Sequence, residues 1–464
     1  MPSLEKLPHD VFCTCLFFLN LIGFIIVSCF ALSYGDPASL VTPPLEQFED
    51  EIYTFNIEEF DAFRHDYGWI ALAIFSSIIA SVIWFFVIKR LSAFMIYIAA
   101  MAGIVIISIL GYYLYHVSRV YDNFELFLLA LVCWTVSLLL TVMLFVFRDK
   151  ILFTSKLLKN SGSILQRNLV ILLRCLLFSM AFFMLSVFAI IVILYLYSVP
   201  TEENTTLLPI TISGDAIVIY DRDTRLLSWF VVVSVLWISQ FLSSLETYII
   251  GYLTLYELSV KAGTVNPERS PVVRAFKEAF VYSAGTIAFG ALVKGILSLL
   301  SIFSKHNRND SNSAPATCCT EYFVKLMKII VDSIVDFAII FSTFNNTNFW
   351  DSAKNVAKLL RQDAATAIFS KLIVHYIFTT GEIVASCFIT LVTVAAIEIT
   401  HGHLSFFVVV TIFFSSYFIF RTVSHSYTSV INTVLLVVLC DKNSPLKRVP
   451  EELTSMIQPS FVEI

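Results

Sequence analysis

Apolar runs long enough to cross a lipid bilayer recur along almost the whole chain. A transmembrane helix needs about 20 consecutive, mostly apolar residues, and none of the 13 prolines lies inside the long runs. Each run is therefore expected to form an uninterrupted helix. The rule predicts ten spans, at residues 11–33, 68–88, 91–116, 125–147, 168–197, 227–255, 279–303, 321–344, 369–396 and 404–439.

The composition agrees with a membrane protein. Hydrophobic residues make up 58% of the 464 residues and charged residues 14%, whereas a soluble domain carries about 25% charged residues. The first run, Val11 to Leu32, is longer than the roughly 7–15 apolar residues of a cleaved signal peptide, so we expect it to remain as a membrane anchor. We therefore predict an all-α integral membrane protein in which residues 1–464 form a single transmembrane domain.

Several functional classes find no support in the sequence. A net charge of −5 argues against a nucleic-acid partner, which requires a basic face. The nine cysteines follow neither a zinc-site spacing nor a disulfide framework. The chain contains no nucleotide-binding glycine loop, no HExxH pair and no credible nucleophile constellation. We expect no enzymatic activity, no metal ion and no cofactor.

The distribution of Lys and Arg orients the predicted spans. With both termini in the cytoplasm, the inner segments contain far more Lys and Arg than the outer ones, as the positive-inside rule requires. The segment 321–344 weakens this assignment because it contains Lys325, Lys328, Asp332 and Asp336. If that segment does not cross the membrane, the orientation of the later spans reverses.

The segments outside the spans have compositions that fit this orientation. The outer loop 35–67 is acidic, which makes it either a simple solvated loop or a negative mouth that concentrates cations. Residues 148–167 alternate between basic and apolar and are expected to form an amphipathic segment along the cytoplasmic membrane surface. Residues 440–464 are expected to be a cytoplasmic tail. Asn204 begins an Asn-Thr-Thr triplet in an outer loop, which is a glycosylation acceptor.

The sixth predicted span carries an aromatic face, whose residues lie within about 80° of one another on a helix. A quaternary ammonium ion cannot donate an N–H hydrogen bond, and proteins bind it by placing aromatic rings around the cation. The face is therefore our candidate substrate-binding site, with plain helix packing as the alternative, because the chain has 43 Phe and 19 Tyr. The candidate residues are Trp237, Phe241, Ser244, Tyr248 and Tyr252.

Two charges in different spans lie at a similar predicted depth. An ionisable residue inside a span costs roughly 2.5–3.5 kcal/mol on insertion scales, so each one is a functional candidate. Lys294 in the seventh span and Glu382 in the ninth are each about 20 Å from the cytoplasmic end. We expect them either to form a salt bridge that joins the two spans or to act as a gating or proton-responsive pair.

A polar stripe runs along the ninth span. His375, Thr379, Glu382 and Ser386 share one helical face. A His and a Glu on one face either carry and sense protons or form a polar seam that neighbouring helices satisfy. Glu246, on the polar face of the sixth span, is a further candidate for an intramembrane charge.

Five short fragments, in order along the chain, form a recognisable pattern. They are Asp10–Phe12 with Tyr34–Pro37 and Leu40, Gly285–Leu292, Cys318–Cys319, Asn348–Asn355 with Leu359–Leu360, and Ser429–Thr433 with Asp441. This pattern resembles the choline transporter-like family of solute carriers and extends from the first predicted span to the last. The resemblance implies a ten-helix transporter of choline or ethanolamine that is coupled or sensitive to protons.

The chain departs from the family pattern at positions that bear on the substrate. Asn432 stands where the family usually has Asp, Glu382 where it has Lys, and Lys294 where it has an apolar residue. The first outer loop lacks the cysteines of the family, so no disulfide is expected there. These differences indicate a divergent member whose substrate could have changed.

We therefore expect transport of choline or a related small organic cation by a saturable carrier in the plasma membrane. A proton link is one version of this hypothesis, and the oligomeric state is left open. The alternatives are an ion channel or lipid-translocating protein, and a membrane scaffold without transport. An open polar groove would favour the first alternative, whereas fully paired polar stripes and no central cavity would favour the second.

Overall fold

The computed structural model describes most of the helical part of the chain. The described residues are 8–35, 67–121, 123–167, 169–198, 211–212, 215–216, 222–267, 270–306, 314–362, 364–401 and 406–441. The acidic loop between 36 and 66, Asn204 and the tail beyond residue 441 lie outside these ranges. The side chains of Cys318 and Cys319 are likewise outside the described part, although their backbone lies in a helix.

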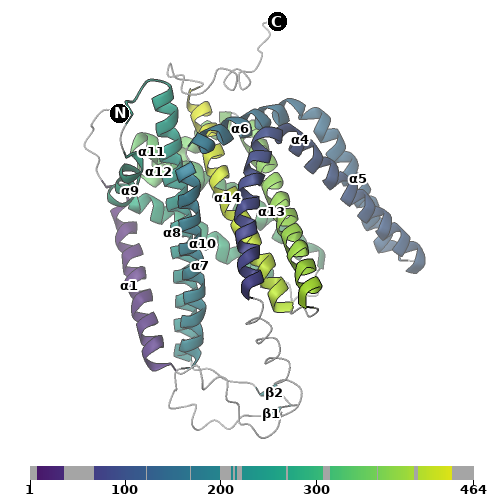
Figure 1. Ribbon diagram of the computed structural model, residues 1–464, viewed down its shortest axis with the longest axis horizontal. Helices are drawn as coiled ribbons and strands as arrows, with labels where there is room; N and C mark the ends of the chain where they lie inside the picture. The colour runs from purple at the N-terminus through teal and green to yellow at the C-terminus, as the bar shows by residue number, and fades with distance from the viewer. Residues whose placement is uncertain are drawn as a thin grey trace. The chain divides into compact units, whose positions relative to one another are not determined.

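Helices account for nearly all of the described residues (Figure 1). In chain order they are α1 (Val11–Tyr34), α4 (Tyr67–Tyr121), α5 (Phe124–Val146), α6 (Arg148–Arg167), α7 (Leu169–Tyr197), α8 (Arg222–Lys261), α9 (Pro271–Val281), α10 (Ala284–His306), α11 (Ala314–Asn345), α12 (Phe349–Gln362), α13 (Ala364–His401) and α14 (Phe406–Asp441). Two short strands, β1 (Thr211–Ile212) and β2 (Asp215–Ala216), pair antiparallel between α7 and α8.

Eight of the described helices are long and apolar enough to cross a membrane. They are α1, α4, α5, α7, α8, α10, α13 and α14. The predicted all-α membrane fold is therefore confirmed. The number of ten spans and the cytoplasmic position of both termini remain predictions, because α4 is long enough for two crossings and α11 is not among the eight.

The second and third predicted spans form the single helix α4, which has a kink. Leu91 has φ −114° and ψ 23°, outside the helical region, and it directly follows Lys89 and Arg90. The next residue, Ser92, places its Oγ atom 2.9 Å from Ser155 Oγ of α6. The predicted boundary between the two spans is therefore right, although no loop separates the two arms of α4.

The helices fall into two compact units. Unit 1 contains α1, α9, α10 and α11 with most of α7, α8 and α12. Unit 2 contains α4, α5, α6, α13 and α14 with the remaining ends of α7, α8 and α12. The candidate aromatic face and Lys294 belong to unit 1, whereas the polar stripe of the ninth predicted span belongs to unit 2.

The seventh predicted span begins later than expected, at Ala284 instead of residue 279. Residues 279–281 end the short helix α9, which has Pro271 in its first turn. At the break between α9 and α10, the carbonyl oxygen of Tyr282 accepts a hydrogen bond of 3.1 Å from the His9 amide. A residue distant in sequence thus satisfies a backbone group at the break, and apolar composition alone does not reveal such a contact.

The predicted amphipathic segment 148–167 is helix α6. Its apolar side is buried and packs against α4, α13 and α14 of unit 2. The Tyr427 hydroxyl of α14 donates a hydrogen bond of 2.6 Å to the carbonyl oxygen of Leu158, and Thr154 Oγ1 donates one of 3.0 Å to Ser370 Oγ of α13. The helix is therefore part of the core of unit 2, and its position at the membrane surface remains a prediction.

Asp10 joins three of the sequence fragments in unit 1. Its Oδ2 atom accepts hydrogen bonds from Thr286 Oγ1 of α10 and from the backbone amide of Phe349, both at 2.9 Å. The Phe349 amide is among the first amides of α12, which have no partner within their own helix. A carboxylate at a helix N-terminus is also favoured by the helix dipole. The fragments that begin at Asp10, Gly285 and Asn348 therefore meet at one side chain.

The same junction requires a glycine at position 285. A Cβ atom on Gly285 would collide with the backbone carbonyl oxygens of His9 and Asp10. A Cβ atom on Gly295, which lies further along α10, would meet no atom within 4 Å. Close approach of the N-terminal segment thus explains the first glycine and leaves the second without a packing requirement.

We predict that Gly285→Ala lowers the Tm of the purified protein, because overpacking costs about 1–3 kcal/mol. Gly295→Ala is the matched control, and it should leave the Tm unchanged or raise it, since alanine favours the helix. Thermal unfolding in detergent measures both variants. Equal effects of the two substitutions would contradict the contact described for Gly285.

Candidate functional site

The predicted aromatic face of α8 is buried in unit 1. The exposed fractions are 7% for Trp237, 7% for Phe241, 0% for Ser244, 2% for Tyr248 and 5% for Tyr252. Trp229, on the same helix, is 55% exposed. The rings of the aromatic face therefore point into the protein, whereas Trp229 points out of it.

Phe17 of α1 covers the first part of this face. Its ring stacks on Phe241 with the ring centroids 4.1 Å apart, and it meets Trp237 edge to face with the centroids 5.6 Å apart. The Trp237 indole Nε1 donates a hydrogen bond of 3.1 Å to the carbonyl oxygen of Ala288 in α10. The two rings are therefore held between α1 and α10.

The second part of the face carries hydroxyl groups. Ser283 Oγ donates a hydrogen bond of 3.0 Å to the Tyr248 hydroxyl. Ser244 lies between Phe241 and Tyr248 along the helix, and its Oγ atom is buried with no hydrogen-bond partner in the described part of the protein. A buried polar atom without a partner is unfavourable, so this position offers an unused hydrogen-bonding group beside the rings.

Lys294 pairs with Asp336 rather than with Glu382. The Lys294 Nζ atom lies 2.5 Å from Asp336 Oδ1 of α11, and Lys294 is 6% exposed. The expected salt bridge between Lys294 and Glu382 is therefore wrong. The sequence analysis considered Asp336 only as a charge that disfavours membrane insertion of residues 321–344. In the structure, α11 places Asp336 beside Lys294, and the Asp336 carboxylate neutralises the buried ammonium group.

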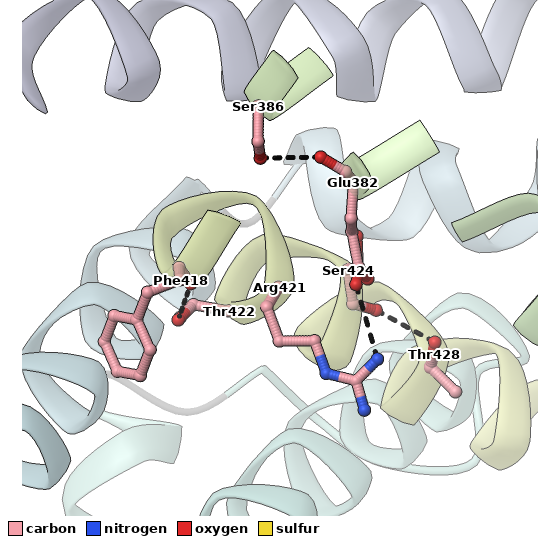
Figure 2. Close-up of polar contacts among 7 residues, drawn as sticks. All are labelled: Glu382, Ser386, Phe418, Arg421, Thr422, Ser424 and Thr428. Atoms are coloured by element: carbon pink, nitrogen blue, oxygen red, sulfur yellow. Dashed lines mark hydrogen bonds and ion pairs between the residues drawn. The ribbon is translucent and has the colours of Figure 1, made fainter. Parts of the chain in front are cut away.

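Glu382 pairs with Arg421 of α14 (Figure 2). Its Oε2 atom lies 3.3 Å from Arg421 Nη1, and the Glu382 side chain is 1% exposed. The second carboxylate oxygen, Oε1, is buried and has no hydrogen-bond partner among the described residues. The sequence analysis did not identify Arg421 as a site residue, although it lies within the last predicted span, which forms the single helix α14.

The predicted polar stripe of α13 is only partly assembled. Ser386 is buried and donates a hydrogen bond of 2.6 Å to the carbonyl oxygen of Glu382 (Figure 2). Thr379 Oγ1 is buried without a hydrogen-bond partner in the described ranges. His375 is exposed instead, although the charges of Arg421 and Glu382 act on its imidazole. The His375 side chain therefore lies within electrostatic reach of the ion pair without being buried beside it.

The remaining predicted charge, Glu246, is buried on α8 and has an interaction partner within the protein. Over the residues that the structure describes, no group of three or more His, Cys, Asp or Glu side chains is arranged to hold a metal ion. The chemistry available at these sites is thus that of aromatic rings, hydroxyl groups and two buried ion pairs.

A polar pocket that the sequence did not indicate lies in unit 2, where the C-terminal ends of α6 and α8 meet α14. Its cavity volume is about 50 Å³, which accommodates a few water molecules. Its polar lining comes from Asn160, Ser163, Arg167, Glu257 and Lys261. Charges of both signs and the absence of aromatic residues from its lining distinguish this pocket from a quaternary ammonium site.

Comparison with known protein families supports the resemblance seen in the sequence. Residues 131–443 match a family described as plasma-membrane choline transporter, and this region is well over half of the chain. It includes the aromatic face of α8 and both buried ion pairs, whereas α1 with Asp10 and Phe17 precedes it. No curated protein matches the chain.

We predict that Lys294→Met destabilises the protein more than Lys294→Met combined with Asp336→Leu. Removing Lys294 takes away a cation that compensates the largely buried Asp336, and breaking a buried pair costs about 3–5 kcal/mol, whereas replacing both partners by apolar residues is often neutral. Thermal unfolding of the purified single and double variants measures the difference. A double variant with a Tm as low as that of the single variant would argue against this assignment.

Proposed function

We propose that this chain, which belongs to the plasma-membrane choline transporter family, is a saturable carrier of choline or a related small organic cation. Family membership and the membrane-length helices make it a multi-pass protein of the plasma membrane that transports a choline-type substrate. The finer proposal concerns the mechanism, the residues that bind the cation and the link to protons.

The observation that carries the proposal is the burial of the α8 rings. A trimethylammonium group is held by aromatic faces, each contributing about 0.5–2 kcal/mol, and Trp237, Phe241 and Tyr248 supply such rings inside unit 1. Choline also carries one hydroxyl group. Ser244 Oγ, which is buried and lacks a hydrogen-bond partner in the described part of the chain, supplies a complementary group between these rings.

The covering of this face favours a carrier over a channel. Phe17 occupies one face of the Phe241 ring, at a centroid distance of 4.1 Å. A cation that binds to this face of Phe241 has to displace the Phe17 ring, so we propose that binding is coupled to a rearrangement of Phe17 on α1. A binding step coupled to a rearrangement saturates with substrate concentration, unlike diffusion through a permanently open pore.

We assign the proton link to Glu382. His375, which is exposed on the same helix, is the second candidate proton-binding group. A carboxylate that is 1% exposed and paired through one oxygen is a site where protonation changes the local charge balance. His375 has the side chain type that titrates most readily near neutral pH. Lys294 and Glu246 are further buried charges, and the pairing of Lys294 with Asp336 favours a structural role for the former.

We predict saturable uptake of labelled choline into liposomes that contain the purified protein. Trp237→Ala should raise the KM about 2- to 30-fold, because it removes one ring contact of about 0.5–2 kcal/mol. Trp229→Ala is the matched control, since it removes an exposed tryptophan from the same helix, and its KM should be unchanged.

The same assay separates the alternative functions. Flux that rises linearly with concentration and is not competed by unlabelled choline indicates a channel or a lipid-translocating protein. No flux from a correctly folded protein indicates a scaffold. Identical KM values for the Trp237 and Trp229 variants would reject the α8 face as the binding site while leaving the carrier function intact.

We predict that an imposed proton gradient changes the rate of choline uptake and that Glu382→Gln abolishes this response. Glutamine keeps the shape of the side chain but cannot exchange a proton. Glu398→Gln is the control, because Glu398 is an exposed carboxylate on the same helix. A proton response that survives in the Glu382 variant would rule out this residue as the proton site.

A further inference from the structure

Arg421 lies deep in the predicted membrane region and is nevertheless half exposed. It contacts Glu382, which lies near the midpoint of α13 (Ala364–His401), roughly 28 Å from either end at 1.5 Å per residue. The Arg421 side chain is 49% exposed. A guanidinium group in contact with lipid at this depth costs several kcal/mol, so such groups almost always face protein or a water-filled cavity.

The face of α14 that carries Arg421 changes from aromatic to polar along the helix, since Phe414, seven residues before Arg421, is 62% exposed. Tyr417, His425 and Thr428 lie four residues before, four after and seven after Arg421, so they share its face of the helix, and all three are partly exposed. The exposed face of α13 is different. It carries Val384, Phe388 and other large apolar side chains that are more than half exposed. The apolar face of α13 is suited to lipid, whereas the Arg421 face of α14, from Arg421 to Thr428, is suited to water.

The carboxylate that Arg421 contacts is incompletely satisfied. Glu382 uses only Oε2 for the ion pair, and its Oε1 atom has no hydrogen-bond partner in the described part of unit 2. Ser424, one helical turn beyond Arg421 on α14, also has a buried Oγ atom without such a partner (Figure 2). A buried carboxylate is costly unless its lone pairs find partners, so Oε1 of Glu382 offers an acceptor to another occupant.

The two partners differ in their freedom to move. A Cβ atom on Gly381 would collide with the Trp84 ring of α4, so the backbone next to Glu382 is in close contact with α4. Arg421 has a long side chain that is 49% exposed. If the pair separates, the arginine side chain is therefore the partner that moves, and the carboxylate keeps its position.

We infer that Arg421 is a tethered cation at the edge of a water-filled path along α14. Its guanidinium group neutralises Glu382 when no transported cation is bound, and it withdraws into the water when a quaternary ammonium ion takes its place beside the carboxylate. The exchange of the guanidinium group for another cation, a proton included, keeps the net charge at Glu382 constant. The identity of the incoming cation rests on the proposed function, whereas the water-filled path does not.

The water-filled path is tested with a membrane-impermeant thiosulfonate reagent that carries a trimethylammonium group. Arg421→Cys and Thr428→Cys proteins are reconstituted in liposomes, treated with the reagent and analysed by peptide mass mapping. Thr428→Cys retains the ion pair, so it remains informative if the Arg421 variant does not fold. Native Cys387, exposed on the apolar face of α13, is the control within the same molecule.

We predict that the cysteines introduced on α14 react at least about tenfold faster than Cys387, because only a hydrated thiol forms the reactive thiolate readily. If the thiol introduced by Thr428→Cys reacts as slowly as that of Cys387, the water-filled path is overturned. Rapid labelling in a protein that shows no choline uptake would contradict the proposed function and leave the path intact.

The cation exchange is tested by the stabilisation that tetramethylammonium confers on Arg421→Gln. Binding to the folded state raises the Tm, so the increase should be larger in this variant than in the unsubstituted protein, since no internal cation competes. The double variant Arg421→Gln with Glu382→Gln lacks the carboxylate and should show no added increase. Equal increases in all three proteins would overturn the exchange.

Discussion

The cost of placing a charge in hydrocarbon determines where the ionisable side chains of this protein can lie. Two of the buried charges, Lys294 and Glu382, each have an oppositely charged partner on a neighbouring helix. The two pairs are not equivalent. Lys294 and Asp336 are both largely buried, which suits a fixed contact between α10 and α11. Arg421 is half exposed, so its contact with Glu382 can open without moving a helix. Because of this difference, we assign a structural role to the pair Lys294–Asp336 and propose a role in transport for the pair Glu382–Arg421.

Three of the family-like fragments pack around one carboxylate, that of Asp10. Asp10 accepts hydrogen bonds from Thr286 and from the first amide of α12, and Gly285 allows the close approach of the chain at Asp10. These fragments are far apart in the sequence, and their common role is to hold α1, α10 and α12 together. Because Phe17 on α1 also covers the α8 rings, the same junction positions the side chain that a substrate would have to displace.

The sequence was sufficient for properties that depend on local periodicity and composition. The all-α membrane fold, the boundary between the second and third apolar runs and the inward direction of the α8 rings follow from apolar runs, two basic residues and a helical repeat. Properties that depend on partners distant in sequence could not be predicted. The break before Ala284 involves a contact from His9, and the choice of Asp336 over Glu382 as the partner of Lys294 depends on how α10 and α11 pack. The roles assigned to the site residues remain proposals.

A structure of the protein with bound choline would test the proposed binding mode most directly. The trimethylammonium group should lie within about 6 Å of the ring centroids of Trp237 and Phe241, with the Phe17 ring displaced from its stacked position and the choline hydroxyl beside Ser244. Choline bound elsewhere, with Phe17 still stacked on Phe241, would contradict the aromatic face as the substrate site.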